Sequence, residues 1–250
     1  MGPDYDHAWF WDRKFARGED IGEWLNSGEP LRDAVLTDLD GRVKRENPKV
    51  LHLGPGISKL GEKLCHSFGD RGWEGSGIVN VDFSIEAVRL GQEAENTKAD
   101  SKAIMPWLHA DLRSWNDLST LAPFGPFDVI MDKSTCDAIA TSEHKTFTPP
   151  SSSYTEDTKG ICPTVLESIP KDEEATLSPV ELLGLHLVPL TKKDSTWIAL
   201  SYSSFRFDSP ILQGYWAVVE KSPIQAPSGL AEGVAHAPKI YHWLYILRRK

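Results

Sequence analysis

Short β-rich runs alternate with amphipathic helical segments along the chain, and this alternation constrains the fold more than any other feature. The run Val50-Leu-His-Leu, for example, is followed by apolar residues at the helical positions 60, 64 and 68, and then by a second β-rich run from Ile78. Strands that alternate with helices favour a parallel sheet with crossover helices. The runs expected to form strands are 50–53, 78–82, 107–111, 127–132, 195–203, 215–220 and 241–247.

The last two runs, 215–220 and 241–247, are separated by a loop rich in Pro and Gly and not by a helix. Consecutive strands without a helix between them pair antiparallel. Apolar residues at helical spacing also predict amphipathic helices over 29–46 and 179–190. The pattern therefore predicts an α/β protein with a mostly parallel sheet that ends in an antiparallel hairpin.

The chain has 250 residues, 40% of them hydrophobic, and a formal net charge of −9. This size suits one large α/β domain, expected over 1–250. The negative charge disfavours nucleic acid as a partner, and three scattered cysteines form neither a disulfide framework nor a metal motif. No apolar run approaches the roughly 20 residues of a membrane span, and the acidic start does not resemble a secretory signal. We therefore expect a soluble cytoplasmic protein without a membrane partner.

Two segments depart from the alternation of strands and helices. Residues 1–28 are dense in aromatic side chains, which indicates a segment that docks on something and is not a free tail. Residues 141–178 are rich in Ser, Thr and Pro and show little periodicity. An insertion of this length is either a mobile loop or a lid over a substrate, and the sequence leaves both possibilities open.

A glycine pair, Gly54-Pro55-Gly56, lies between the first predicted strand and the following helix. Glycines at such a turn let the backbone approach a ligand, and the N–H groups at the start of the helix attract negative charge. A dinucleotide-binding turn has a third glycine three positions after the second. Lys59 stands there, which argues against NAD. An ordinary tight turn remains an alternative.

Acidic residues mark the ends of the next three predicted strands. Asp82 could accept hydrogen bonds from both hydroxyls of an adenosine ribose, although a helix cap at Ser84 is an alternative role for this region. Asp111 could accept from an adenine amino group while Leu112 packs on the ring. The fourth strand ends in Asp132-Lys133. All of these positions lie at the carboxyl ends of consecutive strands, where open α/β sheets bind ligands.

These motifs, taken in order, resemble those of class I S-adenosylmethionine-dependent methyltransferases. The resemblance implies S-adenosyl-L-methionine as the cofactor, no metal, and a Rossmann-like fold with a seven-stranded sheet and helices on both faces. The stretches that carry it are Val50-Leu-His-Leu-Gly-Pro-Gly-Ile-Ser, Val79-Asn-Val-Asp-Phe-Ser, His109-Ala-Asp-Leu and Phe127-Asp-Val-Ile-Met-Asp-Lys-Ser-Thr-Cys-Asp-Ala-Ile.

More narrowly, three stretches are similar to the methyltransferase-like proteins that modify lysines of translation elongation factor 1-alpha. They are Phe10-Trp-Asp-Arg-Lys-Phe, Glu23-Trp24 and Asp132-Lys-Ser-Thr-Cys-Asp-Ala. Two stretches depart from that family, which usually has Cys-Gly-Asn-Ser where this chain has Pro55-Gly56-Ile57-Ser58, and Tyr where Phe15 stands. The insertion at 141–178 is not covered by the resemblance.

The predicted cofactor site combines the strand-end residues with aromatic residues of the N-terminal segment, whose faces attract the sulfonium cation of the cofactor. Matched to the family's motifs, its members are Trp11, Phe15, Trp24, Gly54, Pro55, Gly56, Asp82, Phe83, Ser84, Asp111, Leu112, Asp132 and Lys133.

The resemblance implies methyl transfer to a lysine of a protein, possibly elongation factor 1-alpha. A small-molecule O-, N- or S-methyltransferase is an alternative, and a silent cofactor- or partner-binding module is another. Methyl transfer depends mainly on alignment of the reacting atoms. Asp132, Asp137 and Tyr202 are expected near the mouth of the site, but the sequence does not identify a general base. The Asn/Asp-Pro-Pro-Tyr/Phe motif of adenine-methylating enzymes does not follow the fourth strand.

Overall fold

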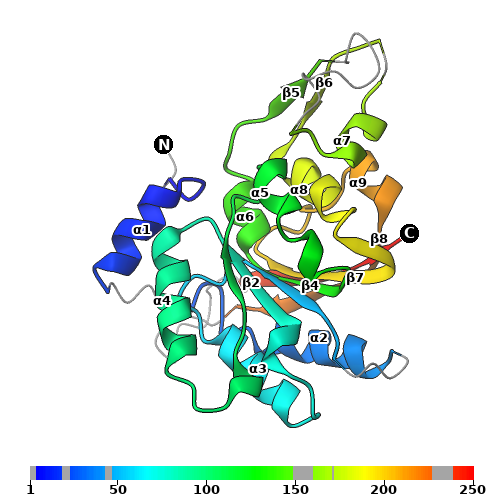
Figure 1. Cartoon of the computed structure of the whole chain (residues 1–250). Helices are drawn as coiled ribbons and strands as arrows, with labels where there is room; N and C mark the ends of the chain where they lie inside the picture. Colours follow the sequence, from blue (N-terminus) through cyan, green and yellow to red (C-terminus); the bar gives the residue numbers. More distant parts are fainter. Residues whose placement is uncertain (1–3, 19–22, 43–46, 149–159, 171, 227–238) are drawn as a thin grey trace.

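The computed structural model describes residues 4–18, 23–42, 47–148, 160–170, 172–226 and 239–250. Its main strands are β1 Val50–Leu53, β2 Ile78–Asp82, β3 Trp107–His109, β4 Phe127–Lys133, β7 Thr191–Ser201, β8 Trp216–Gln225 and β9 Tyr241–Arg249. Within the described part of the chain they form one seven-stranded sheet in the order β3-β2-β1-β4-β7-β9-β8 (Figure 1). The first five strands of this order are parallel, and β9 is antiparallel to both of its neighbours. The predicted Rossmann-like architecture and its hairpin are confirmed.

Helices cover both faces of the sheet, because successive strand residues point to opposite sides. Leu51 and Leu53 belong to the core under one face, and Val50 to the core under the other. Short 3-10 helices span Gly75–Gly77, Ser101–Ala103 and Ala122–Phe124. The face of Val50 is covered by α2 Glu29–Asp40 and α3 Leu60–Gly69. The helix α4 Ile85–Asn96 packs on β2 and β3. The face of Leu51 is covered by four helices, α5 Trp115–Ser119, α6 Thr135–Ile139, α8 Pro179–Leu187 and α9 Pro210–Tyr215. No helix in these described ranges is long and apolar enough to cross a membrane.

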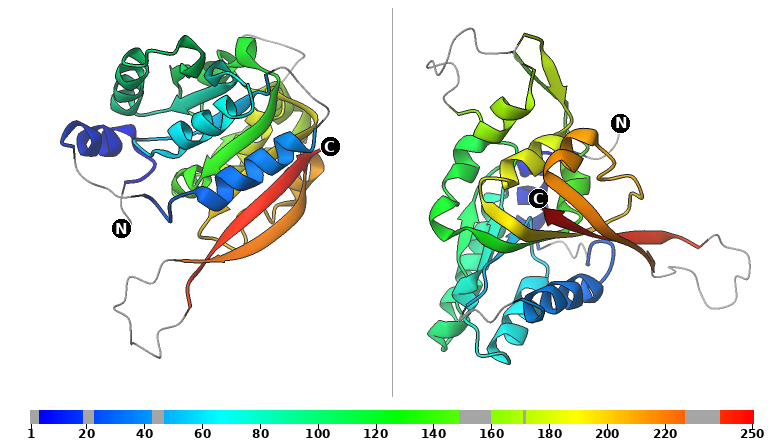
Figure 2. Two further views of the ribbon diagram at one scale, coloured as in Figure 1. Left: turned by 90° about the horizontal axis from the view of Figure 1, so that it is seen from below. Right: turned by 90° about the vertical axis from the view of Figure 1, so that its right-hand side faces the viewer.

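The hairpin differs from its predicted boundaries. Tyr215, expected to begin a strand, is the last residue of α9, a helix capped by the Ser209 hydroxyl at the Leu212 amide. The strand β8 therefore begins at Trp216 and continues to Gln225, and β9 reaches Arg249. Figure 2 shows this pair at one edge of the sheet. The residues 43–46 of the predicted helix 29–46 lie outside the described residues, and α2 ends at Asp40.

The N-terminal segment forms a helix, α1 Ala8–Ala16, which lies beside α4 (Figure 1). The Asp12 carboxylate accepts hydrogen bonds from the Ser84 hydroxyl at 2.6 Å and from the Glu86 amide at 3.2 Å. These bonds satisfy groups at the start of α4, where helix N–H groups lack partners within the helix. Residues 4–18 are thus docked on the domain, as the aromatic density predicted.

The insertion 141–178 contains more structure than its sequence indicated. The strands β5 Lys145–Phe147 and β6 Ala175–Leu177 pair antiparallel, and the helix α7 Pro163–Ser168 packs on α8. A small core that includes Val165, Leu177 and Leu185 joins the insertion to the domain. The sequence did not indicate this core, because the composition of the insertion is polar and only a few of the insertion's side chains are buried. Residues 149–159 and 171 of the insertion lie outside the described residues.

Candidate functional site

A cavity of about 880 Å³ opens at the carboxyl ends of β1, β2 and β4, between the N-terminal segment and α6. All of the predicted cofactor residues line it except Ser84 and Asp132. Further lining comes from Thr141, Ser142, Glu143 and Lys145 at the start of the insertion and from Tyr202 after β7. The site is therefore assembled from segments that lie far apart in the sequence.

The glycine turn needs glycine at both positions. Gly54 and Gly56 each have φ of 53°, a conformation that other residues adopt at a cost. A Cβ atom on Gly54 would lie 2.5 Å from the hydroxyl oxygen of Thr135, and one on Gly56 would lie 3.2 Å from the Phe15 ring. The Thr135 hydroxyl donates to the Leu53 carbonyl at 2.8 Å, which holds it against the turn. The turn is consequently packed between β4–α6 and α1.

Asp82 ends β2 beside this turn and is almost fully buried. One of its oxygens accepts from the Gly56 amide at 2.9 Å, and the other accepts from the Ser84 amide at 2.9 Å. Burial raises the pKa of Asp82 to about 6, although these two hydrogen bonds oppose the shift. Because a carboxylate has about four acceptor positions, two remain for a ligand in the cavity.

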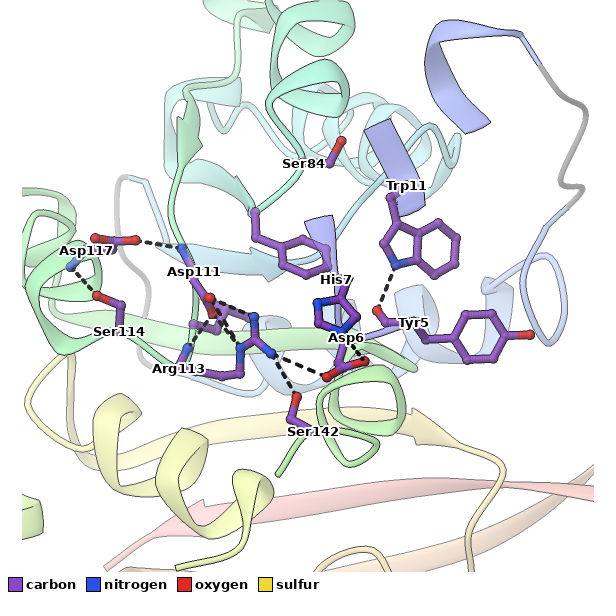
Figure 3. A network of polar contacts seen from close by, with 12 residues as sticks. Tyr5, Asp6, His7, Trp11, Ser84, Asp111, Arg113, Ser114, Asp117 and Ser142 are labelled. Carbon is purple, nitrogen blue, oxygen red and sulfur yellow. Dashed lines mark hydrogen bonds and ion pairs between the residues drawn. The ribbon is translucent and has the colours of Figure 1, made fainter. Parts of the chain in front are cut away.

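The residues at the end of β3 show a partner that sequence reasoning missed. Arg113 donates to both oxygens of Asp111, at 2.8 Å from Nη2 and 2.9 Å from Nε, and also donates to the Ser142 hydroxyl at 2.9 Å (Figure 3). Its guanidinium lies 3.9 Å from the carboxylate of Asp6. Burial alone would raise the pKa of Asp111, but the bonds from Arg113 outweigh it and lower the pKa. An adenine amino group at Asp111 would therefore share this carboxylate with Arg113.

The aromatic residues of the N-terminal segment form one cluster against the cavity. The ring of Trp11 lies 5.8 Å from Phe15, 5.9 Å from Trp24 and 5.8 Å from Tyr5, centre to centre. The Trp11 indole donates to the Tyr5 carbonyl at 2.8 Å (Figure 3). The Trp24 indole donates to the Ser134 hydroxyl at 3.1 Å. Tyr5 also lines the cavity and was not among the predicted site residues.

Lys133 reaches the cavity from the end of β4, with most of its side chain buried. Its ammonium group donates to the Glu23 carboxylate, to the Ser58 hydroxyl at 3.2 Å and to the Asn26 carbonyl at 3.4 Å. Burial would raise the pKa of Glu23, but the bonds from Lys133 and Ser58 lower it. Glu23 stood in a motif of the sequence resemblance but was not predicted as a site residue.

Two of the predicted cofactor residues serve other contacts. Ser84 caps α4 by accepting from the Ala87 amide at 3.1 Å, the alternative that the sequence left open. Asp132 is fully buried and accepts from the Thr135 amide at 2.8 Å and from the Trp197 indole at 3.3 Å. Burial raises the pKa of Asp132 to about 6. Neither residue lines the cavity, so both hold the strand ends in place.

Asp137 lines the cavity, but its carboxylate has little acceptor capacity left. It accepts from the Ser134 hydroxyl at 2.6 Å, the Ser201 hydroxyl at 2.5 Å, the Tyr202 amide at 3.1 Å and Arg206 at 2.8 Å. This arrangement disfavours Asp137 as a general base. In the described part of the chain, no group of three or more His, Cys, Asp or Glu side chains could hold a metal ion.

No family model matches the sequence. A methyltransferase of Neurospora crassa, srdJ, is 29% identical over 251 aligned residues, which cover 99% of this chain and 85% of that protein.

Solved structures of methyltransferases share the fold. The N-methyltransferase NodS from Bradyrhizobium japonicum, in complex with S-adenosyl-L-homocysteine, is similar with a TM-score of 0.55 and 12% identity over 99% of each chain. A SAM-dependent methyltransferase from Anabaena variabilis has a TM-score of 0.55 and 10% identity over 100% of this chain and 96% of that one. Magnesium protoporphyrin IX methyltransferase from Synechocystis, with bound SAM, has a TM-score of 0.52 and 12% identity over 100% and 99%. The chain thus has the Rossmann-like fold of class I methyltransferases, and a curated methyltransferase resembles it over almost its whole sequence.

Proposed function

We propose that the protein is an S-adenosylmethionine-dependent methyltransferase that binds its cofactor in the cavity at the carboxyl ends of β1, β2 and β4. One observation carries this proposal. The glycine turn and the buried carboxylate of Asp82 line one cavity and are joined by a hydrogen bond from Gly56. In open α/β sheets this position, after consecutive strands, is where nucleotide ligands bind.

The residues around the cavity suit the parts of the cofactor. Asp82 has acceptor positions left for ribose hydroxyls, and Phe83 and Leu112 offer apolar surface for adenine. Trp11, Phe15 and Trp24 present ring surfaces, which attract a sulfonium cation by about 0.5–2 kcal/mol. The absence of a third glycine at Lys59 does not affect this assignment, because no pyrophosphate has to be held.

When bound, the cofactor would supply an electrophilic methyl group on its sulfonium, and loss of this group would give a neutral thioether. The protein's own residues bind the adenosine, exclude water with the aromatic cluster, and hold the acceptor in line with the methyl group. Alignment at about 3–3.5 Å accounts for a large part of the rate enhancement in such a displacement. No side chain has to act as a nucleophile.

We further propose a small molecule as the acceptor, in place of the protein lysine that the resemblance implies. The cavity of about 880 Å³, which would hold the cofactor and the acceptor together, lies within the range of roughly 300–1,000 Å³ that small-molecule sites occupy. It is bounded by the N-terminal segment on one side and by residues 141–145 on another. Ala138, Ile139 and Leu182 contribute apolar side chains to its lining.

Transfer of a labelled methyl group from S-adenosylmethionine tests both statements. The purified protein, the labelled cofactor and a cell extract are incubated together, and label is then measured separately in protein and in the small-molecule fraction. Label in small molecules supports the proposal, and label in a protein band refutes the small-molecule acceptor. If calorimetry detects no binding of S-adenosylhomocysteine, the cofactor assignment itself is wrong.

A further inference from the structure

The last residue of β4 and the residue after it both hold the N-terminal segment. Lys133 binds Glu23 and the carbonyl of Asn26, and Ser134 accepts from the indole of Trp24. These contacts join residues about 110 positions apart in the sequence. They fasten residues 23–26 next to the glycine turn, at the edge of the cavity.

The contacts of Lys133 use all of its donors. An ammonium group has three N–H bonds, and in the structure these meet Glu23, Asn26 and Ser58. The side chain of Lys133 is only 6% exposed, so its charge depends on the Glu23 carboxylate for compensation. Glu23 also accepts from the Ser58 hydroxyl at 2.8 Å and from the Lys59 amide at 3.1 Å. This one carboxylate therefore links the N-terminal segment, the glycine turn and the end of β4.

The second contact depends on an unusual backbone conformation. Ser134 has φ of 65°, which is rare for a residue other than glycine. Its hydroxyl donates to Asp137 at 2.6 Å, so its lone pairs face the Trp24 indole. Asp137 is itself fixed by Arg206 and the Ser201 hydroxyl. The indole of Trp24 is thus attached to a rigid part of the domain.

The two contacts differ in their relation to the cavity. Trp24, Ser58, Lys133 and Ser134 line it, whereas Glu23 does not. Glu23 is exposed and lies outside the lining, so it acts on the cavity only through the residues that it holds.

We infer that Glu23 is a positioning residue: with Lys133 and Ser134 it forms a latch that holds Trp24 over the cavity, and the opening of this latch limits cofactor exchange. This inference rests on the proposed function, because it takes the cavity to be the cofactor site. Lys133 then acts as the anchor of the latch and not as a direct ligand of the cofactor.

The variant Glu23→Gln tests the latch with a minimal change in shape. We expect S-adenosylhomocysteine to dissociate about tenfold faster, measured by stopped-flow tryptophan fluorescence. We also expect faster amide hydrogen exchange over residues 23–28, because Gln leaves the Lys133 charge uncompensated. The matched control is Glu29→Gln, which removes a nearby exposed carboxylate whose pair with Lys63 is long, at 3.7 Å. Neither quantity should change in this control.

A double-mutant cycle separates the latch from a general loss of stability. In a Lys133→Met background no buried cation remains, so Glu23→Gln should change exchange over 23–28 by less than twofold. An equal effect in both backgrounds would refute the link through Lys133. Unchanged dissociation in a Glu23→Gln variant with faster exchange would refute the role in cofactor exchange. If the wild-type protein does not bind S-adenosylhomocysteine, the proposed function fails, whereas the hydrogen exchange still tests the latch.

Discussion

The substitution Asp82→Asn tests the cofactor site most directly. Asp82 accepts from the amides of Gly56 and Ser84 and lines the cavity, and about two of its acceptor positions are left for a ligand. Asparagine has the same shape but only one acceptor oxygen, so the variant loses at least one hydrogen bond from a ribose hydroxyl to an ionised carboxylate. Such a bond contributes about 1.5–3 kcal/mol. Since 1.4 kcal/mol corresponds to a factor of ten, we expect the Kd for S-adenosylhomocysteine to rise by about tenfold to one hundredfold.

Isothermal titration calorimetry at pH 7.5 measures this change. The control is Asp70→Asn, which alters an exposed aspartate at the end of α3 and should leave the Kd unchanged. A thermal melt must show that the Asp82 variant is folded, because one backbone amide loses its acceptor in it. An unchanged Kd in a folded Asp82→Asn protein would refute the reasoning, since the carboxylate would then make no contact with the ligand.

Of four further predictions, two concern pH, one the glycine turn and one Arg113. Because burial raises the pKa of Asp82 to about 6, the affinity for S-adenosylhomocysteine should fall as pH drops below about 6, and this dependence should be weaker in Asp82→Asn when both are titrated by calorimetry. The raised pKa means that the folded protein binds a proton at Asp82 more tightly than the unfolded chain does. The contribution of Asp82 to the free energy of unfolding should therefore decrease as pH rises from about 4 to 6, which urea titrations of the wild-type protein and of Asp82→Asn can check. Gly54→Ala should lower the free energy of unfolding by at least about 2 kcal/mol, because a Cβ there would lie 2.5 Å from Thr135 at a φ of 53°. The control Gly69→Ala, whose Cβ would meet nothing within 4 Å, should not lower it. Equal melting temperatures of the two variants would contradict this prediction. Arg113→Lys should lower the stability by about 0.5–1 kcal/mol and weaken cofactor binding severalfold, because lysine cannot contact both oxygens of Asp111, and unchanged binding in calorimetry would show that this pair does not shape the site.

The structure differs from the sequence-based expectations at particular elements, for identifiable reasons. Residues 210–215 form a helix because Ser209 caps it and Pro210 suits its first turn, although the aromatic Tyr215 favoured a strand. The insertion forms β5, α7 and β6, because a few apolar side chains pack on α8 even though its composition is polar. Asp132 satisfies amides of the α6 turn and does not reach the cavity.

The predicted strands and the glycine turn were recognisable because their signals are local. The alternation of strands and helices, the pair Gly54 and Gly56, and the acidic residue one unit later each depend on neighbouring residues along the chain. The mostly parallel sheet with a terminal antiparallel hairpin that they predict is present in the structure. Eleven of the thirteen predicted cofactor residues line the cavity. Eight of them lie at or just after strand ends, which meet at one edge of a parallel sheet, and the other three, Trp11, Phe15 and Trp24, come from the N-terminal segment.

The amino-acid sequence alone thus determined the class of fold, the edge of the sheet that carries the site, and the position of its glycine turn. Only the tertiary structure decided that Glu23 and Trp24 meet Lys133 and Ser134, and that Arg113 joins Asp111 to Ser142. Periodicity and turn chemistry act over a few residues and leave a pattern in the chain. A hydrogen bond between residues far apart in the sequence leaves none, because it depends on how whole elements pack.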